Sequence, residues 1–368
     1  MKIGILTFHY AHNFGAMLQA FALKKYLERA GYHVSFIDYR NENIVRTYPK
    51  NIWRQLHKKW IVQPRDWKKL FYEIEKLRSS TTQWRVRWEL FHDFMCGELI
   101  DRLSNKNDDL FDCYDIIFFG SDQIWEKNIT NGYDPYYFGR FKTHAIKASY
   151  GASCYSIQED MDETVLSALD SFQYLSVRES SLADYLTAYL KRKVICVCDP
   201  VFLLDEKVYS EIMCEQEAEG YILFYYVSDH PILREIAKKV RNKMEYKVIE
   251  VGSYRVDQMD PIRIDIGPRE FLGLVKGARY VFTNSFHGTA FSIIFKKDFT
   301  SVGGGMRIKD LLDKVGLESR YAQTVLTAME QMEIAVQYEK IEKKKQDYIK
   351  GSLDYIAAVL KDEEYYHG

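Results

Sequence analysis

The chain has 368 residues, 47% of them hydrophobic, and a formal net charge of -1. This length favours two domains, and the balanced charge excludes a strongly basic, nucleic-acid-binding molecule. No run of about 18 apolar residues occurs, which excludes a membrane-spanning helix. Because the first residues enter an apolar strand directly, we expect no signal peptide and a cytoplasmic location.

Six cysteines are scattered along the chain. They form no CxxC pair and no His/Cys cluster with zinc spacing. Cys196 and Cys198 alternate on a predicted strand, where two residues on one face are poorly placed to bridge each other. We therefore expect reduced thiols and no metal site.

The first 40 residues predict a β–α–β unit. Strands are expected over residues 3–8 and 34–38, with a helix over about 16–29 between them. The turn after the first strand lacks the three glycines of a dinucleotide-binding fingerprint. Asp38 stands where a ribose-binding acid would fall, so nucleotide binding here is an alternative hypothesis.

A basic, tryptophan-rich stretch follows over about residues 46–98, and we expect it to be a helical insertion, although Pro64 should kink or break a helix. Between residues 46 and 89, twelve Lys or Arg stand against four acids. One interpretation is an amphipathic segment packed through its tryptophans with a solvated basic face. The other is a surface that meets anionic glycan or lipid headgroups, which would bring the protein to the inner face of the membrane.

Strands then alternate with polar turns and helices. A predicted strand over residues 114–119 is followed by Gly120, Ser121, Asp122 and Gln123. Turns of this kind lie at the carboxyl ends of parallel strands, where ligands bind. Asp122 is a candidate base for a hydroxyl group, or a cap for its own turn. Further strands are expected over residues 145–150, 174–177, where Arg178 follows, and 193–198, where Asp199 and Pro200 follow.

The stretch from residue 279 to 297 carries the most chemistry. Residues 280–283 predict a buried strand and 289–295 an apolar helix. The polar turn between them contains His287, beside amide hydrogens that favour anions. Imidazole has an unperturbed pKa of about 6.5 and can exchange a proton near neutral pH. The alternative is structural, with Ser285 as a helix N-cap and His287 bonded to nearby backbone.

The alternation of elements predicts an α/β protein with two parallel-sheet domains that face a cleft. We expect an N-terminal domain over residues 1–200, with the insertion, and a C-terminal domain over 201–330. The remaining residues, 331–368, predict a charged helix that crosses back to the first domain.

Five short motifs, in the same order, resemble those of the polysaccharide pyruvyl transferase family. Each is weak alone, but together they span most of the chain outside the insertion and the tail. The motifs are NFGAMLQA (13–20), GSDQIW (120–125), SVRE (176–179), DP (199–200) and TNSFHGTAFS (283–292).

The resemblance implies a fold of two Rossmann-like domains, the architecture called GT-B. It implies transfer of pyruvate from phosphoenolpyruvate to a saccharide as a ketal, in cell-surface or exopolysaccharide biosynthesis. No metal or redox cofactor is needed for this scheme. The acceptor sugar, its attachment to a lipid and the oligomeric state are left open.

The resemblance also suggests roles for residues. His287 matches the family's histidine, the acid for the donor's methylene carbon, and Arg178 matches an arginine that holds the donor. The alternative for Arg178 is a salt bridge with Glu179 or Asp199. Where other branches of the family have an arginine, this chain has Ser285, and Arg307 is our substitute, ahead of Arg279, Lys296 and Lys297. The other expected donor-binding residues are Asn284, Ser285, Gly288 and Thr289, and the expected acceptor or cleft residues are Asn13, Gly15, Gly120, Ser121, Asp122 and Gln123.

Two other functions fit the same architecture. A nucleotide-sugar glycosyltransferase would need a ribose-binding acid in the second domain, for which Glu250 is the candidate. A non-catalytic glycan-binding relative would keep the scaffold without turnover.

Overall fold

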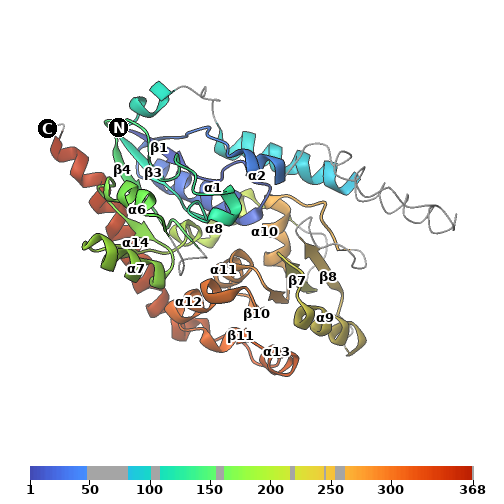
Figure 1. The fold of residues 1–368 in the computed structure, drawn as a ribbon. Coiled ribbons are helices and arrows are strands. Elements are labelled where there is room, and N and C mark those ends of the chain that lie inside the picture. The colour runs from blue at the N-terminus through green and yellow to red at the C-terminus, as the bar shows by residue number, and fades with distance from the viewer. Residues whose placement is uncertain are drawn as a thin grey trace.

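The computed structural model contains two parallel β-sheets, each flanked by helices (Figure 1). The structure describes residues 1–47, 82–100, 108–154, 161–215, 220–243, 246–252 and 262–366. Most of the basic stretch, residues 48–81, lies outside the described residues, and so does the surface role suggested for it.

The first sheet has the strand order β2-β1-β3-β4, all parallel, with Ile3 of β1 paired to Val34 on one side and Ile116 on the other. Its strands are rich in Ile, Val and Phe because helices cover both faces. Single bridges, such as that between Ala148 and Tyr174, join it to the short pair β5-β6. The strands are β1 (Lys2–Leu6), β2 (His33–Phe36), β3 (Ile116–Phe119), β4 (Ile146–Ser149), β5 (Ser176–Val177) and β6 (Ile195–Cys196), and the helices are α1 (Phe14–Arg29), α2 (Glu42–Thr47), α5 (Lys127–Thr130), α6 (Glu163–Asp170) and α7 (Ser180–Leu190).

The second sheet has the order β11-β10-β9-β7-β8, again all parallel. The short helices η4 (Pro200–Leu203) and α8 (Glu206–Ile212) lead into it from the first lobe. Its strands are β7 (Ile222–Tyr226), β8 (Val248–Gly252), β9 (Tyr280–Thr283), β10 (Asp298–Val302) and β11 (Tyr321–Ala322), and its helices are α9 (Pro231–Lys243), α10 (Pro268–Gly277), α11 (Phe286–Ile294), α12 (Gly305–Val315) and α13 (Val325–Met332).

Each sheet has a point where the chain reverses its direction of travel across the strands. In the first sheet this point lies between β1 and β3, and in the second between β7 and β9. Ligands of open parallel sheets bind at the carboxyl ends of such strand pairs. The polar turns that follow β1, β3 and β9 all start at these ends. The predicted fold class is confirmed.

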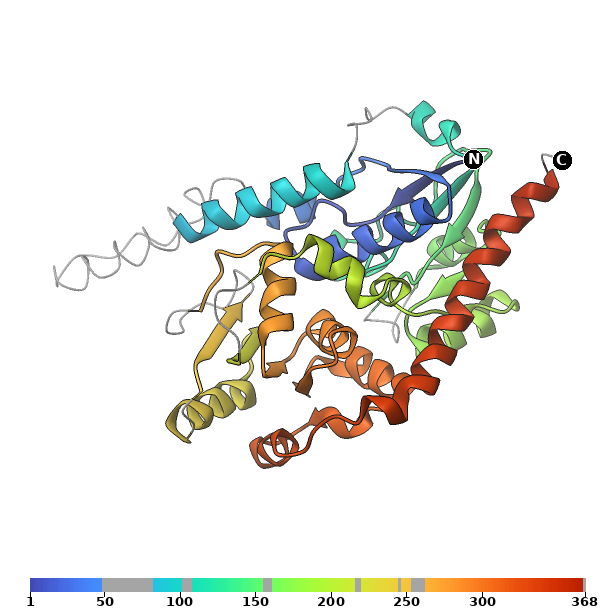
Figure 2. The same ribbon diagram turned by 180° about the vertical axis from the view of Figure 1, so that it is seen from behind.

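The two lobes are packed against each other through α1. Phe14 of α1 stacks on Phe271 of α10, with ring centroids 4.7 Å apart. Helix α14 (Tyr338–Tyr366) runs from the second lobe along the first, as Figure 2 shows in red. Its Tyr355 hydroxyl donates to the Ser149 carbonyl at 2.7 Å, and its Ser352 hydroxyl accepts from the Cys198 amide at 2.7 Å.

The described end of the basic stretch is a helix over residues 82–94 that continues into a π-helical turn, Met95–Leu99. Its Arg87 is buried between the lobes, where it donates to the carbonyls of His12 at 3.0 Å and Ile264 at 3.3 Å. This guanidinium also lies over the ring of Phe14, 4.7 Å from its centroid. The helix therefore joins both lobes.

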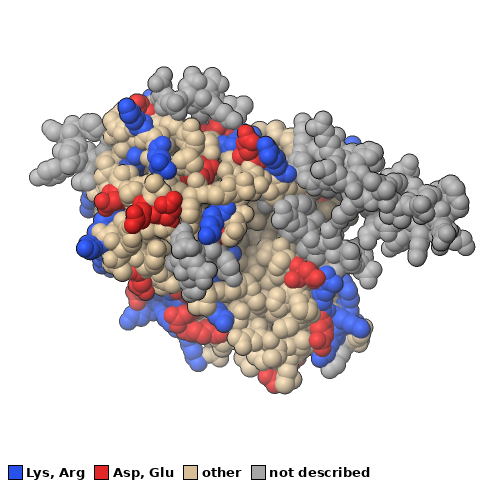
Figure 3. All heavy atoms as spheres, in the orientation of Figure 1, with Lys and Arg blue, Asp and Glu red and all other residues tan. Residues whose placement is uncertain are grey.

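Acidic and basic side chains are interspersed over the described surface visible in Figure 3. This matches the near-neutral composition. Of the helices in the described ranges, none has the length and apolar character needed to cross a bilayer.

Candidate active site

The turn between β9 and α11 is built by its own polar side chains. Ser285 has an extended backbone, and its Oγ accepts a hydrogen bond from the Gly288 amide at 3.2 Å, so it is the N-cap of α11. Asn284 accepts from the Val227 amide at 2.9 Å and donates to the Ser228 carbonyl at 2.9 Å. These bonds join the ends of β9 and β7 and fix the first turn of α11.

The remaining donor-binding candidates of this turn also hold its shape. The Thr289 hydroxyl donates to the Ser285 carbonyl at 2.9 Å and shares a hydrogen bond with Ser301 at 2.7 Å. A Cβ on Gly288 would lie 2.5 Å from the Thr283 hydroxyl, so a side chain does not fit there. The ring of His287 points away from this network and toward the first lobe.

His287, Asp199 and Arg178 form one buried cluster. The His287 Nε2 atom lies 3.4 Å from Asp199 Oδ2, and Arg178 Nη1 donates to the same oxygen at 2.5 Å. The Arg178 guanidinium stacks on Phe286, 4.6 Å from the ring centroid. Its Nε lies 3.6 Å from Glu179 Oε1. The loops after β5, β6 and β9 therefore meet at this point.

The charges of the cluster stabilise each other. Burial alone would raise the pKa of Asp199, but His287 and Arg178 outweigh it and hold the pKa at about 2. Burial opposes the charge of Arg178, yet Asp199, Glu179 and Asp122 raise the pKa of this guanidinium above its usual value. Asp199 and Arg178 are therefore an ionised pair at neutral pH.

Asp199→Asn should destabilise the protein by about 3–5 kcal/mol at pH 7, because it leaves the buried Arg178 charge without its partner. A carboxylate with a lowered pKa stabilises the fold fully above its unfolded value of about 3.9 and loses that contribution as the pH falls through its folded value. The gap between wild type and variant should therefore shrink between pH 4 and 2. Urea unfolding measures both, and equal stabilities at pH 7 would contradict the account. The exposed Asp354→Asn is the matched control, expected within about 0.5 kcal/mol of wild type.

Gly15 of the first lobe covers one face of the His287 ring. A Cβ built on Gly15 would lie 1.9 Å from Nδ1, 2.3 Å from Cε1 and 2.4 Å from Cγ of that ring. A point at these three distances lies above the ring plane, so Gly15 approaches the face of the imidazole and does not block its edge. Asn13 holds this approach, since its Oδ1 caps α1 by accepting from the amides of Gly15 at 2.9 Å and Ala16 at 3.2 Å.

The turn after β3 is braced to the same lobe. The Ser121 amide donates to Gln19 Oε1 at 3.2 Å, and the Ser121 hydroxyl donates to the Gly151 carbonyl at 3.0 Å. Gly120 has a φ of 112, in the region that favours glycine, and packs on the Tyr150 carbonyl.

Of the two roles weighed for Asp122 from the sequence, the structure shows the cap. Its Oδ1 accepts from the amide of Gln123 at 2.9 Å, so it caps its own turn. Its charge also acts on Arg178, which brings this turn to the edge of the cluster.

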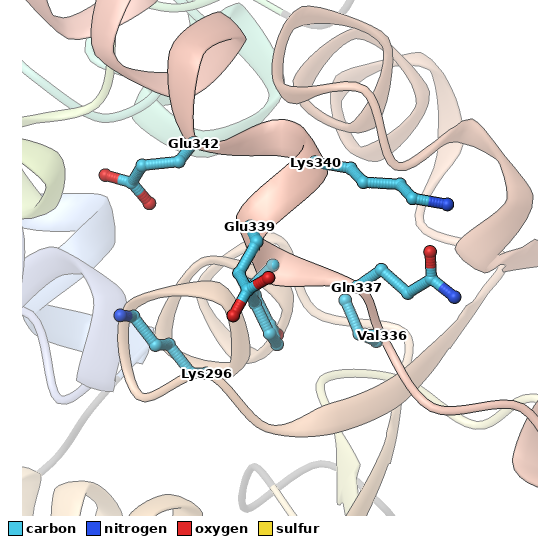
Figure 4. Close-up of a pocket in the computed structure, with 7 residues that line it drawn as sticks. Lys296, Val336, Gln337, Glu339, Lys340 and Glu342 are labelled. Carbon is cyan, nitrogen blue, oxygen red and sulfur yellow. The ribbon is translucent and has the colours of Figure 1, made fainter.

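Arg307 lies at the cluster, whereas the three other substitutes for the missing arginine do not. It stands in the first turn of α12 and lowers the pKa of Glu179 through its charge. Arg279 precedes β9, at the opposite end of the strand, and contacts the Tyr246 ring. Lys296 and Lys297 follow α11 at the end remote from His287, and Lys296 lines a surface pocket of about 540 Å³ beside the start of α14 (Figure 4).

From the sequence, Glu179 and Asp199 are expected only as salt-bridge partners of Arg178, and the structure contains both ion pairs. Asp199 contacts His287, and Glu179 lies beside Arg178. The signal in the sequence is their position within matched motifs, since Asp199 directly follows a predicted strand and Glu179 follows one after Arg178.

Several buried polar atoms of the cluster have no hydrogen-bond partner in the described part of the chain. Arg178 Nε and Nη2 and Glu179 Oε2 are buried and make no hydrogen bond there. Buried polar groups almost always have hydrogen-bond partners. Three atoms without such partners close together therefore indicate a ligand site. The two donor nitrogens fit an anion, and the carboxylate oxygen fits a hydroxyl or amide donor.

Two parallel α/β lobes that meet at the carboxyl ends of their strands define a protein of the GT-B class. A protein of Listeria monocytogenes described as a UDP-N-acetylglucosamine 2-epimerase is similar in fold, with 10% identity, a TM-score of 0.50 and coverage of 99% of this chain and 97% of that chain. The chain belongs to the polysaccharide pyruvyl transferase family, which matches residues 13–304 and confirms the resemblance drawn from the motifs.

Two further solved structures are similar more distantly. The UDP-GlcNAc 2-epimerase of Methanocaldococcus jannaschii has 12% identity, a TM-score of 0.46 and coverage of 92% and 93% of the two chains. Heptosyltransferase WaaC of E. coli has 10% identity, a TM-score of 0.39 and coverage of 94% of this chain and 99% of that one. A comparison with curated proteins found no match.

Proposed function

We propose that the protein transfers pyruvate from phosphoenolpyruvate to a saccharide as a ketal, in cell-surface or exopolysaccharide biosynthesis. The observation that carries this proposal is the buried His287–Asp199–Arg178 cluster, in which two guanidinium nitrogens of Arg178 make no hydrogen bond with the described residues. It combines a proton donor with a fixed positive charge, and the donor substrate requires both. Membership of the family supports it.

The donor carries a carboxylate and a phosphate, which guanidinium groups bind well. Arg178 and Arg307 supply these groups from the two lobes. An imidazolium at His287 gives its proton to the methylene carbon, and the neighbouring carbon becomes electrophilic. The first acceptor hydroxyl loses its proton as its oxygen bonds to that carbon, which balances the proton given by His287. The second hydroxyl then displaces phosphate and gives up its proton to phosphate or solvent, so the products are the ketal and inorganic phosphate.

Asp199 holds the imidazole in place for this step. Its carboxylate faces Nε2, which leaves the Nδ1 edge of the ring for the donor. A carboxylate beside a catalytic histidine orients the ring and stabilises its protonated form. Because the charge of Arg178 also lowers the pKa of Asp199, this carboxylate stays ionised while the imidazole changes charge.

The direct assay is incubation with phosphoenolpyruvate and a candidate acceptor glycan. We expect release of inorganic phosphate in step with the appearance of acid-labile pyruvate on the glycan. Phosphate release without pyruvylated product would contradict the proposal, since it would indicate a phosphatase. Our proposal includes a cytoplasmic location and a saccharide acceptor, with a lipid-linked acceptor and a membrane contact of the basic stretch as its extensions.

A nucleotide-sugar donor is less well supported. Glu250 is buried, and its carboxylate is paired with Arg241. Asp38 is engaged by Arg40 at 2.6 Å and by His9 at 3.3 Å. Calorimetry should therefore detect binding of phosphoenolpyruvate and none of nucleoside diphosphates, and the reverse result would favour a glycosyltransferase.

A further inference from the structure

The Glu179 carboxylate has one committed oxygen and one uncommitted oxygen. Oε1 accepts from the Ser153 hydroxyl at 2.5 Å and lies 3.6 Å from Arg178 Nε. Oε2 is buried and makes no hydrogen bond with the described residues. Leaving a buried acceptor unpaired costs free energy, so a bound donor group is the expected partner.

The other two carboxylates near Arg178 already have partners within the protein. Asp199 uses Oδ2 for Arg178 and His287, and its Oδ1 accepts from the Val201 amide at 3.1 Å. Asp122 is less buried, and its Oδ1 holds its own turn. Glu179 is therefore the acid that best fits a substrate hydroxyl.

We propose that Glu179 Oε2 binds the attacking hydroxyl of the acceptor and takes its proton. This inference rests on the proposed pyruvyl transfer. The hydroxyl O–H bond breaks as its oxygen bonds to the central carbon of the donor, and the methylene carbon gains its proton from His287. Glu179 ends this step protonated and His287 neutral, and a proton passed between them through solvent restores both.

The electrostatics of the cluster support this division of roles. Burial raises the pKa of Glu179, although Arg178, the Ser153 hydrogen bond and Arg307 oppose it. The pKa of Asp199, also beside Arg178, is held at about 2. Neighbouring acids with opposite shifts commonly divide acid, base and electrostatic roles, and a base with a raised pKa is the better proton acceptor near neutral pH.

Glu179→Gln should lower kcat for pyruvyl transfer by about 10²–10⁴-fold, the usual contribution of a general base. Binding of phosphoenolpyruvate, measured by calorimetry, should change far less. In Glu179→Ala, added formate should restore part of the rate, because a small carboxylate can enter the vacated space. A merely structural role would give no such rescue.

The pH dependence provides a second readout. The wild-type rate should fall at low pH, as Glu179 takes up a proton. The midpoint of this fall should lie at a pH above the ordinary glutamate pKa of about 4.3. The charged groups that face Glu179 are Arg178 and Arg307, with Asp199 across Arg178. Ser153→Ala removes a hydrogen bond that lowers the pKa of Glu179. We expect this variant to fold, and the acid limb of its pH–rate profile should shift to higher pH.

The outcomes separate the two proposals. If the wild type transfers no pyruvate to any acceptor, the proposed function fails. If it does, a Glu179→Gln variant with near wild-type kcat, or an acid limb unmoved in Ser153→Ala, overturns the role of Glu179 alone. The Ser153→Ala test holds even if both Glu179 variants fail to fold.

Discussion

Replacement of His287 by asparagine should lower the rate of pyruvyl transfer by about 10²–10⁴-fold, since the amide cannot supply a proton to the methylene carbon. Asparagine keeps a polar side chain at this first-turn position of α11, so the turn should persist. The measurement is the steady-state rate of phosphate release at saturating donor and acceptor. The loss should appear mainly in kcat, because Arg178 and Arg307 still bind the donor.

The matched control is His33→Asn, on the exposed face of β2 in the first sheet. It should retain full activity. A His287→Asn variant as active as this control would remove the proton-transfer role assigned to the ring.

Gly15→Ala should reduce kcat by about 10²-fold or more. The added methyl would lie 1.9 Å from His287 Nδ1, so either the ring or the start of α1 must shift. A displacement of about 1 Å at a reacting group is enough for a loss of this size. The rate of phosphate release and the circular dichroism spectrum together measure it, with the spectrum expected to remain that of the wild type.

Gly351→Ala tests whether the effect is specific. Gly351 lies in α14 with no neighbouring atom within 4 Å of an added Cβ. Alanine there should stabilise the helix by about 0.5–1 kcal/mol and leave the rate unchanged. Full activity of Gly15→Ala would show that the close approach of α1 to His287 is not needed for the reaction.

The fold could be predicted because its signals are local. Buried strands such as residues 280–283 are continuous β-branched and aromatic runs, and polar turns follow them. Alternation of these runs with helical patterns predicts parallel sheets, and it places the turns at one edge of each sheet. The turn around His287 was therefore found from its own residues.

The pairing of His287 with Asp199 could not be predicted in this way. The two residues stand on different lobes and far apart in the chain, so no spacing rule relates them. The same is true of Gly15, which was expected at the cleft as part of a motif. Its close contact with the imidazole depends on how α1 packs against α11.

Arg87 shows the limit of composition as a guide. It stands in a strongly basic stretch, for which a solvated face is the usual prediction. The structure instead buries it against aromatic rings and backbone carbonyls of both lobes. Its partners come from other elements, and only the tertiary structure shows them.

A crystal structure of the protein with phosphoenolpyruvate bound tests the central claim most directly. The account predicts donor oxygens within hydrogen-bond distance of Arg178 Nη2, and the methylene carbon at the edge of the His287 ring. A donor molecule bound elsewhere, for example at the pocket beside Lys296, with no contact to either side chain, would contradict it.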